Sequence, residues 1–156
     1  MENTQEMTII YTNENIFDSP CDALVNPINC VGVMGKGLAL QFKNKYPKMF
    51  EAYRLACQKG WVAPGRLFVY PEEDGKLIIG FPTKIHWKDQ SKIEYLEAGL
   101  IKLKKLIEER SIRSIAIPAL GCGLGQLRWN EVKPLMESHL SDIENIIIHI
   151  HLPLKG

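Results

Sequence analysis

Two short apolar runs in this sequence each lead into a glycine-rich loop, and this pairing constrains the fold more than any other feature. The run "DALVN" precedes "GVMGKGLAL", and "SIAIPAL" precedes "GCGLGQL". Apolar runs without strict alternation are typical of strands buried on both faces of a sheet, and a helix-like segment follows each loop. The order of strand, loop and helix predicts an α/β fold, a three-layer α/β/α sandwich.

The remaining segments complete this prediction. Apolar residues keep helical spacing most clearly in "SKIEYLEAGLIKLKKLIEER", and we expect Asn130 to cap a later helix, "NEVKPLMESHL". Two strands around the turn "EEDG" have the look of an antiparallel hairpin, so the central sheet should be mixed. Helices are predicted at 38–46, 48–59, 91–110 and 130–140, and strands at 7–13, 22–26, 65–70, 76–83, 113–120 and 145–151.

Length and composition predict a single soluble domain over residues 1–156. The chain has 156 residues, of which 46% are hydrophobic, and no apolar run approaches the roughly 18 residues of a membrane span. The N-terminus lacks the basic and apolar regions of a signal peptide, so we expect a cytoplasmic protein. Its four cysteines form no CxxC pair and no metal-ligand spacing, which predicts reduced thiols and no metal site.

The charges are segregated along the chain although the net charge is only +1. Residues 23–50, 75–88 and 110–130 contain none of the 18 Asp and Glu residues but ten of the 19 Lys and Arg residues. Both glycine loops lie in these acid-free windows, as does Lys84. Such surroundings favour a phosphate ligand, although a solvated basic face is an alternative.

The two loops suit the two phosphates of a diphosphate. Backbone N–H groups at a glycine-rich turn that enters a helix bind phosphate oxygens well. Neither loop fits GxGxxG, and the Walker pattern fails because Cys30 replaces its first glycine and Gly37 replaces its Ser or Thr. Kinase, ATPase and dehydrogenase functions therefore lose support, while ordinary tight turns remain the alternative.

Several side chains near these loops are candidates for chemistry. Asn26 and Asn29 follow a strand, where their amides could bond ribose hydroxyls or simply cap a turn. Lys84, flanked by apolar residues, could have a lowered pKa and act as nucleophile or base, or could be a solvated surface lysine. Trp87 could stack on a nucleobase, or belong to a core or interface.

Other candidates are weaker. Cys122 lies between two glycines, where it could be a nucleophile, but a small side chain in a tight loop is the simpler interpretation. His149 and His151 share a strand face without a third metal ligand. The three windows also lack the paired carboxylates of most glycosidases.

Four segments, "DALVNPIN", "GVMGKGLALQFKNKYP", "GFPTKIHWK" and "PALGCGLGQLRW", together resemble the macrodomain family. The pattern "FPTK.HW" and the loop "GVMGKG" are similar to those of the DNA ADP-ribosyl glycohydrolase antitoxins of the DarG type. A eukaryotic terminal ADP-ribose hydrolase belongs to the same group. The resemblance implies a three-layer macrodomain that binds ADP-ribose, compatible with the N-terminal part of a longer antitoxin.

The resemblance also implies residue roles. Asn15 and Ile16 would bind adenine, with Asn15 replacing the usual Asp, while Asn26 and Asn29 would bind the distal ribose. The remaining ADP-ribose contacts would come from the two phosphate loops and the residue before Lys84: Gly32, Val33, Met34, Gly35, Lys36, Gly37, Leu38, Thr83, Gly121, Cys122, Gly123, Leu124 and Gly125. The DNA or its base would meet His86, Trp87 and Lys88.

Lys84 falls on the lysine that DarG-type enzymes use in catalysis. In the eukaryotic relative this lysine attacks the anomeric carbon, assisted by an Asp at the position of Gly125. The implied activity removes ADP-ribose from a base of single-stranded DNA and reverses the action of a partner toxin. This hydrolysis calls for neither a metal nor a cofactor. We expect a monomer with no membrane partner. A reader of ADP-ribose, or a hydrolase or phosphatase of other ADP-ribose derivatives, is the alternative.

Overall fold

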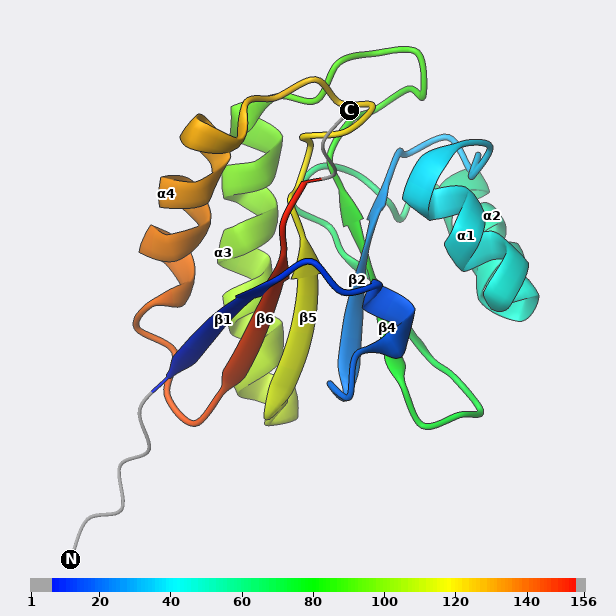
Figure 1. Ribbon diagram of the computed structural model, residues 1–156. Coiled ribbons are helices and arrows are strands. Elements are labelled where there is room, and N and C mark those ends of the chain that lie inside the picture. The colour runs from blue at the N-terminus through cyan, green and yellow to red at the C-terminus, as the bar shows by residue number, and fades with distance from the viewer. Residues whose placement is uncertain (1–6, 154–156) are drawn as a thin grey trace, which may run out of the picture.

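The sheet of this protein has six strands in the order β1-β6-β5-β2-β4-β3 (Figure 1). The computed structural model describes residues 7–153. Neighbouring strands are parallel except for the antiparallel pair β3 and β4, so the predicted mixed sheet is confirmed. The strands are β1 (Thr8–Thr12), β2 (Ala23–Ile28), β3 (Phe68–Pro71), β4 (Leu77–Pro82), β5 (Ser114–Pro118) and β6 (Ile147–His151).

Four α-helices and one short 3₁₀ helix connect these strands. The elements are η1 (Ile16–Asp18), α1 (Gly37–Lys45), α2 (Pro47–Gln58), α3 (Ile93–Arg110) and α4 (Trp129–Leu140). Pro47 occupies the first position of α2, where its missing N–H is not needed. The expected cap at Asn130 is wrong, because α4 already begins at Trp129 and its N-cap residue, Arg128, makes no side-chain cap.

Helices cover both faces of the sheet, which confirms three layers. Successive strand residues point to opposite faces. Val25 accordingly packs in one apolar cluster with α3 and α4, while Leu24 and Ile28 pack in a second cluster with α1 and α2. Figure 1 displays these helix pairs on either side of the strands. Within residues 7–153, no helix has the length and apolarity needed to span a membrane.

The chain changes direction across the sheet between β2 and β5. The connection through α1 and α2 leads from β2 to β3 and β4 on one side, whereas α4 leads from β5 to β6 on the other. Pairing of β2 with β5 covers only Ala23 and Leu24, although pairing of β2 with β4 continues to Ile28. Ligands of open α/β sheets bind at such switch points, beyond the carboxyl ends of the strands.

Candidate functional site

The first glycine loop, residues 32–38, runs from the end of β2 into the first residues of α1, and Asn29 shapes its start. The Asn29 Oδ1 accepts from the backbone N–H groups of Val31 and Val33 at 3.1 and 3.4 Å, and Nδ2 donates to the Val33 carbonyl at 2.7 Å. The Tyr53 hydroxyl of α2 lies 2.7 Å from the same Oδ1. Asn29 therefore uses its amide to build the loop, and its predicted ribose contact remains a prediction.

Asn26 lies inside β2, because the strand continues two residues past its predicted end to Ile28. Its side chain is fully buried, with Nδ2 3.8 Å from the Met34 sulfur. The Oδ1 atom has no hydrogen-bond partner within residues 7–153. A buried amide oxygen without a partner is unusual, and it leaves Asn26 able to accept a bond from a ligand hydroxyl.

The segment carrying Lys84 runs beside the first glycine loop. The Thr83 N–H donates to the Ile28 carbonyl at 2.9 Å, and the Cys30 N–H donates to the Ile85 carbonyl at 2.8 Å. The Cys30 thiol also lies 3.6 Å from the Lys84 carbonyl. These bonds continue the pairing of β2 and β4 beyond the sheet and fix Lys84 next to the loop.

The second glycine loop, residues 121–125, contacts the first glycine loop and also Ser91, which follows the Lys84 segment in the chain. The Gly125 carbonyl accepts from the Ser91 N–H at 3.0 Å. A Cβ placed on Gly37, at the start of α1, would lie 3.2 Å from Leu124 Cδ1, so the two glycine loops meet there. The φ angle of +59° at Gly37 also favours glycine.

Both loops present backbone N–H groups that are free to bind an anion. Within residues 7–153, the N–H groups of Gly123, Leu124 and Gly125 donate to no partner. The same holds for residues 35–37 at the N-terminus of α1, where the helix dipole adds positive potential. Two such donor sets at one switch point suit a ligand with two phosphates.

Lys84 combines partial burial with few partners. Its Nζ lies 3.4 Å from the Trp87 carbonyl, a long hydrogen bond. Burial lowers the pKa of Lys84 from its ordinary value, and the Asp89 carboxylate opposes that shift. A larger neutral fraction makes the amine a better nucleophile or base than a solvated lysine.

Asn15 and Ile16 lie beyond β1, at the start of η1. The Asn15 Oδ1 accepts from the Phe17 N–H at 2.9 Å and so caps the 3₁₀ helix, while Ile16 is buried. The neighbouring Glu14 carbonyl lies 2.8 Å from His151 Nδ1. Their predicted adenine contacts remain predictions.

An aromatic surface extends from Lys84 into solvent. Trp87 is 46% exposed, the His86 ring lies 5.3 Å from it, and the Lys88 ammonium lies 5.2 Å from the indole centroid. Trp87 and Lys88 are both exposed, so an aromatic ring and a cation face solvent here, as suits a flat or anionic partner.

The structure weakens the two minor candidates. Burial raises the pKa of the Cys122 thiol to about 11, so it is not a thiolate at neutral pH. In the part of the chain from residue 7 to 153, no three His, Cys, Asp or Glu side chains are grouped to hold a metal ion. His149 and His151 thus gain no third ligand from the described residues.

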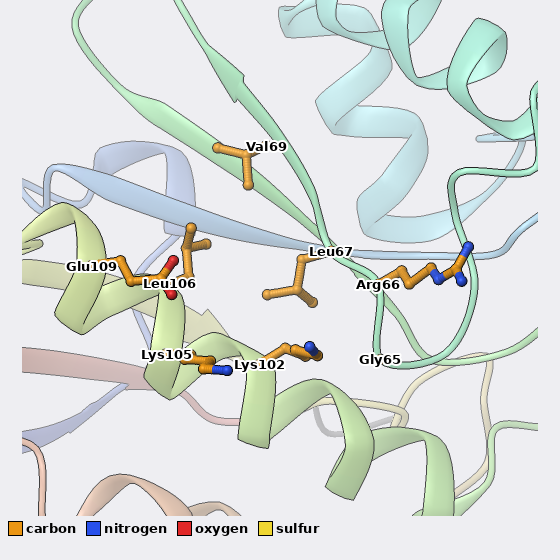
Figure 2. A pocket seen from close by; sticks show the side chains of 8 residues that line it. All are labelled: Gly65, Arg66, Leu67, Val69, Lys102, Lys105, Leu106 and Glu109. Carbon is orange, nitrogen blue, oxygen red and sulfur yellow. The ribbon is translucent and has the colours of Figure 1, made fainter.

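An open cavity of about 320 Å³ lies elsewhere, between α3 and the segment that enters β3 (Figure 2). Arg66, Lys102 and Lys105 line it together with apolar side chains. No residue predicted for the site is among its lining residues. The candidate site is therefore defined by the loops beyond β2, β4 and β5.

Some supporting residues were missed by the sequence analysis. Tyr53 holds Asn29 from α2, Ser91 bonds the second loop, and Gln90 donates to Gln126 Oε1 at 2.7 Å. Gln90 and Ser91 lie just beyond the acid-free window that ends at residue 88. Their place in the chain a few residues after Lys84 was the only sequence signal for Gln90 and Ser91, and Tyr53 had none.

A three-layer α/β domain with two N–H-lined glycine loops at its switch point has the architecture typical of domains that bind phosphate-containing ligands. Residues 25–136 match the Macro domain family, and the chain belongs to that family. The predicted macrodomain fold is confirmed by the solved Macrodomain of Thermus aquaticus DarG. That structure has a TM-score of 0.90 and 43% sequence identity, and the match covers 94% of this chain and 99% of that one.

Two further relatives are longer proteins. A "DNA ADP-ribosyl glycohydrolase" of Mycobacterium tuberculosis is 46% identical over 151 residues, which are 95% of this chain and 43% of that protein. The structure "Thermosipho africanus DarTG in complex with ADP-ribose" has a TM-score of 0.91 and 35% identity, covering 96% of this chain and 42% of that one. This chain therefore spans less than half the length of both proteins.

Proposed function

We propose that this chain is a DNA ADP-ribosyl glycohydrolase, which hydrolyses the N-glycosidic bond between ADP-ribose and a DNA base. The observation that carries the proposal is the convergence of Lys84 with both glycine loops at one end of the sheet. The similarity to the Mycobacterium tuberculosis glycohydrolase covers 95% of the chain and supports the same reaction. The complex of the Thermosipho africanus relative supports ADP-ribose as the ligand.

In the proposed reaction the two glycine loops would bind the substrate and Lys84 would take part in the chemical step. The free N–H groups of the two loops would anchor the diphosphate, and Asn26 would bind the distal ribose. The bond from the anomeric carbon to the base breaks, its electron pair and a proton leave with the base, and water supplies the new hydroxyl. Lys84, whose pKa burial lowers, would attack that carbon or accept a proton from water.

The aromatic surface supports DNA as the carrier of the modification. Trp87 and His86 would stack on bases of a single strand, and Lys88 would contact its phosphates. We further propose that the chain acts as a single macrodomain and a monomer in the cytoplasm, where it reverses the modification made by a cognate toxin.

A Lys84→Ala variant tests this proposal. Release of ADP-ribose from modified single-stranded oligonucleotides, with thymidine-linked and guanosine-linked substrates side by side, should fall about 10²–10⁴-fold. Binding of free ADP-ribose, measured by calorimetry, should stay within about threefold of wild type. The matched control Lys102→Ala lies at the cavity between α3 and β3 and should keep full turnover.

A reader that binds ADP-ribose without cleaving it is the second candidate, favoured by the missing loop carboxylate at Gly125. Wild-type protein that binds the modified strand tightly and releases nothing would establish the reader. Unchanged turnover in Lys84→Ala would instead remove Lys84 from the mechanism while keeping the reaction.

A further inference from the structure

The Ser91 hydroxyl is buried without a partner. Ser91 is only 4% exposed, and its Oγ makes no hydrogen bond within residues 7–153. A buried hydroxyl of this kind destabilises the folded state unless something else uses it. Serines before helices usually cap them, but the N-cap residue of α3 is Lys92 and no side chain caps that helix. Helix capping therefore does not explain Ser91.

The side chain lies directly against the second glycine loop. Besides the bond from the Ser91 N–H to the Gly125 carbonyl, a Cβ built on Gly125 would fall 2.2 Å from Ser91 Oγ. A Cβ on Gly121 would fall 3.2 Å from Ser91 Cβ. Ser91 thus fills the space that a side chain at position 125 would need, and brings a polar oxygen to that place.

The Ser91 hydroxyl lies beside Gly125, at one end of a run of free donors in the loop. The N–H groups of Gly123, Leu124 and Gly125 are without partners in the described residues, and Leu124 is 58% exposed. The Gln90–Gln126 bond at 2.7 Å anchors the neighbouring residues of both segments. The Ser91 Oγ is inaccessible to solvent in this structure, so a ligand oxygen reaches it, directly or through one water, when the outer half of the loop moves aside.

We propose that Ser91 is a ligand-binding residue of the second glycine loop, whose hydroxyl donates a hydrogen bond to a phosphate oxygen of bound ADP-ribose, directly or through one water. The inference rests on the proposed function for the identity of its ligand. It makes the segment from Lys84 to Ser91 a contributor to both the chemistry and the anchoring of the diphosphate.

A Ser91→Ala variant separates binding from stability. Its affinity for ADP-ribose in calorimetry should fall about tenfold, since a hydrogen bond to a charged oxygen is lost. Its Tm should stay unchanged or rise, because the substitution removes an unpartnered buried hydroxyl. Ser114→Ala is the matched control: the Ser114 hydroxyl accepts from the Asp22 N–H at 2.8 Å, at the opposite end of β5. That control should lose Tm and keep its affinity.

The outcomes are distinguishable. Ser91→Ala with wild-type affinity overturns the inference while cleavage by the wild type keeps the proposed function. A wild type that neither binds ADP-ribose nor releases it overturns both. Equal loss of affinity and Tm in Ser91→Ala makes Ser91 a structural support and also overturns the inference. Ser91→Cys keeps a group of similar size with a weaker donor, so the same loss of affinity is expected and wild-type affinity would contradict it.

Discussion

Lys84 is placed where two opposing electrostatic effects act on one amine. Burial disfavours the ammonium and lowers the pKa of Lys84, while the nearby Asp89 carboxylate favours it and raises that pKa. Asp89 is held in place because its carboxylate accepts from the His86 N–H at 3.2 Å and its own N–H donates to the His86 carbonyl at 3.0 Å. The turn that exposes Trp87 therefore also holds the carboxylate that raises the pKa of Lys84.

We predict that Asp89→Asn shifts the pH dependence of turnover to lower pH. If the neutral amine reacts, the rate rises as pH passes through the pKa of Lys84. Removing the carboxylate withdraws a group that stabilises the ammonium, so this pKa falls further and the rising limb moves down. The measurement is kcat against pH, with the exposed helix variant Glu97→Gln as control. A limb that moves up, or does not move, would contradict a neutral Lys84.

Site residues that act through their backbone N–H groups could be predicted from the sequence, whereas the contacts of site side chains mostly could not. The spacing of the glycines predicted both glycine loops, because a loop that presents backbone N–H groups is determined by consecutive residues. For Asn29 the sequence left a ribose contact and a turn cap open, and the structure shows that its amide bonds the following turn. The further contact from the Tyr53 hydroxyl of α2 could not be read from the sequence, because it depends on how α2 packs. Ser91 was also missed, since its burial follows from the tertiary path of the second loop.

At the scale of elements, α3 packs closely on β4 through Gly99. A Cβ on Gly99 would lie 2.3 Å from Cζ of Phe81, whose ring is fully buried. Phe81 lies three residues before Lys84 on the strand that delivers it to the site. The glycine in this otherwise regular helix is therefore a packing requirement, although glycine weakens a helix.

Gly99→Ala should accordingly destabilise the protein. Overpacking against Phe81 is expected to lower the free energy of unfolding by about 1–3 kcal/mol, even though alanine favours the helix. Urea denaturation followed by circular dichroism measures this change. Gly123→Ala provides the comparison, because its Cβ would meet no atom within 4 Å and its stability should change by less than about 0.5 kcal/mol. Equal stabilities would show that Phe81 moves aside at no cost.

Helices and strands were predicted most closely where the spacing of apolar residues was regular. The 18-residue helix α3 has apolar residues spaced along one face, and its predicted range begins only two residues early. The end of β2 was misplaced because Pro27 argues against a central strand, yet here β5 no longer pairs with β2 at that point. The helix α4 begins at Trp129, one residue before its predicted start, and no side-chain cap marks that start.

At the scale of the whole molecule, the strand order brings the three acid-free windows together. The three acid-free windows contain β2, β4 and β5, and the sheet order places these strands side by side. Loops that are far apart in the chain thereby meet at one end of the sheet. Three sequence windows become a single acid-poor region around the two glycine loops, which favours an anionic partner.

This arrangement predicts that binding of the modified single strand weakens with salt more steeply than binding of free ADP-ribose. Each phosphate contact on a single strand contributes a slope of about −0.7 to log K against log salt. Lys88→Ala should therefore make the slope shallower by about 0.7, measured by fluorescence anisotropy over a salt series. Lys102→Ala, at the cavity of Figure 2, should leave the slope unchanged. If Lys102→Ala changes the slope and Lys88→Ala does not, the strand follows α3 and not the glycine loops.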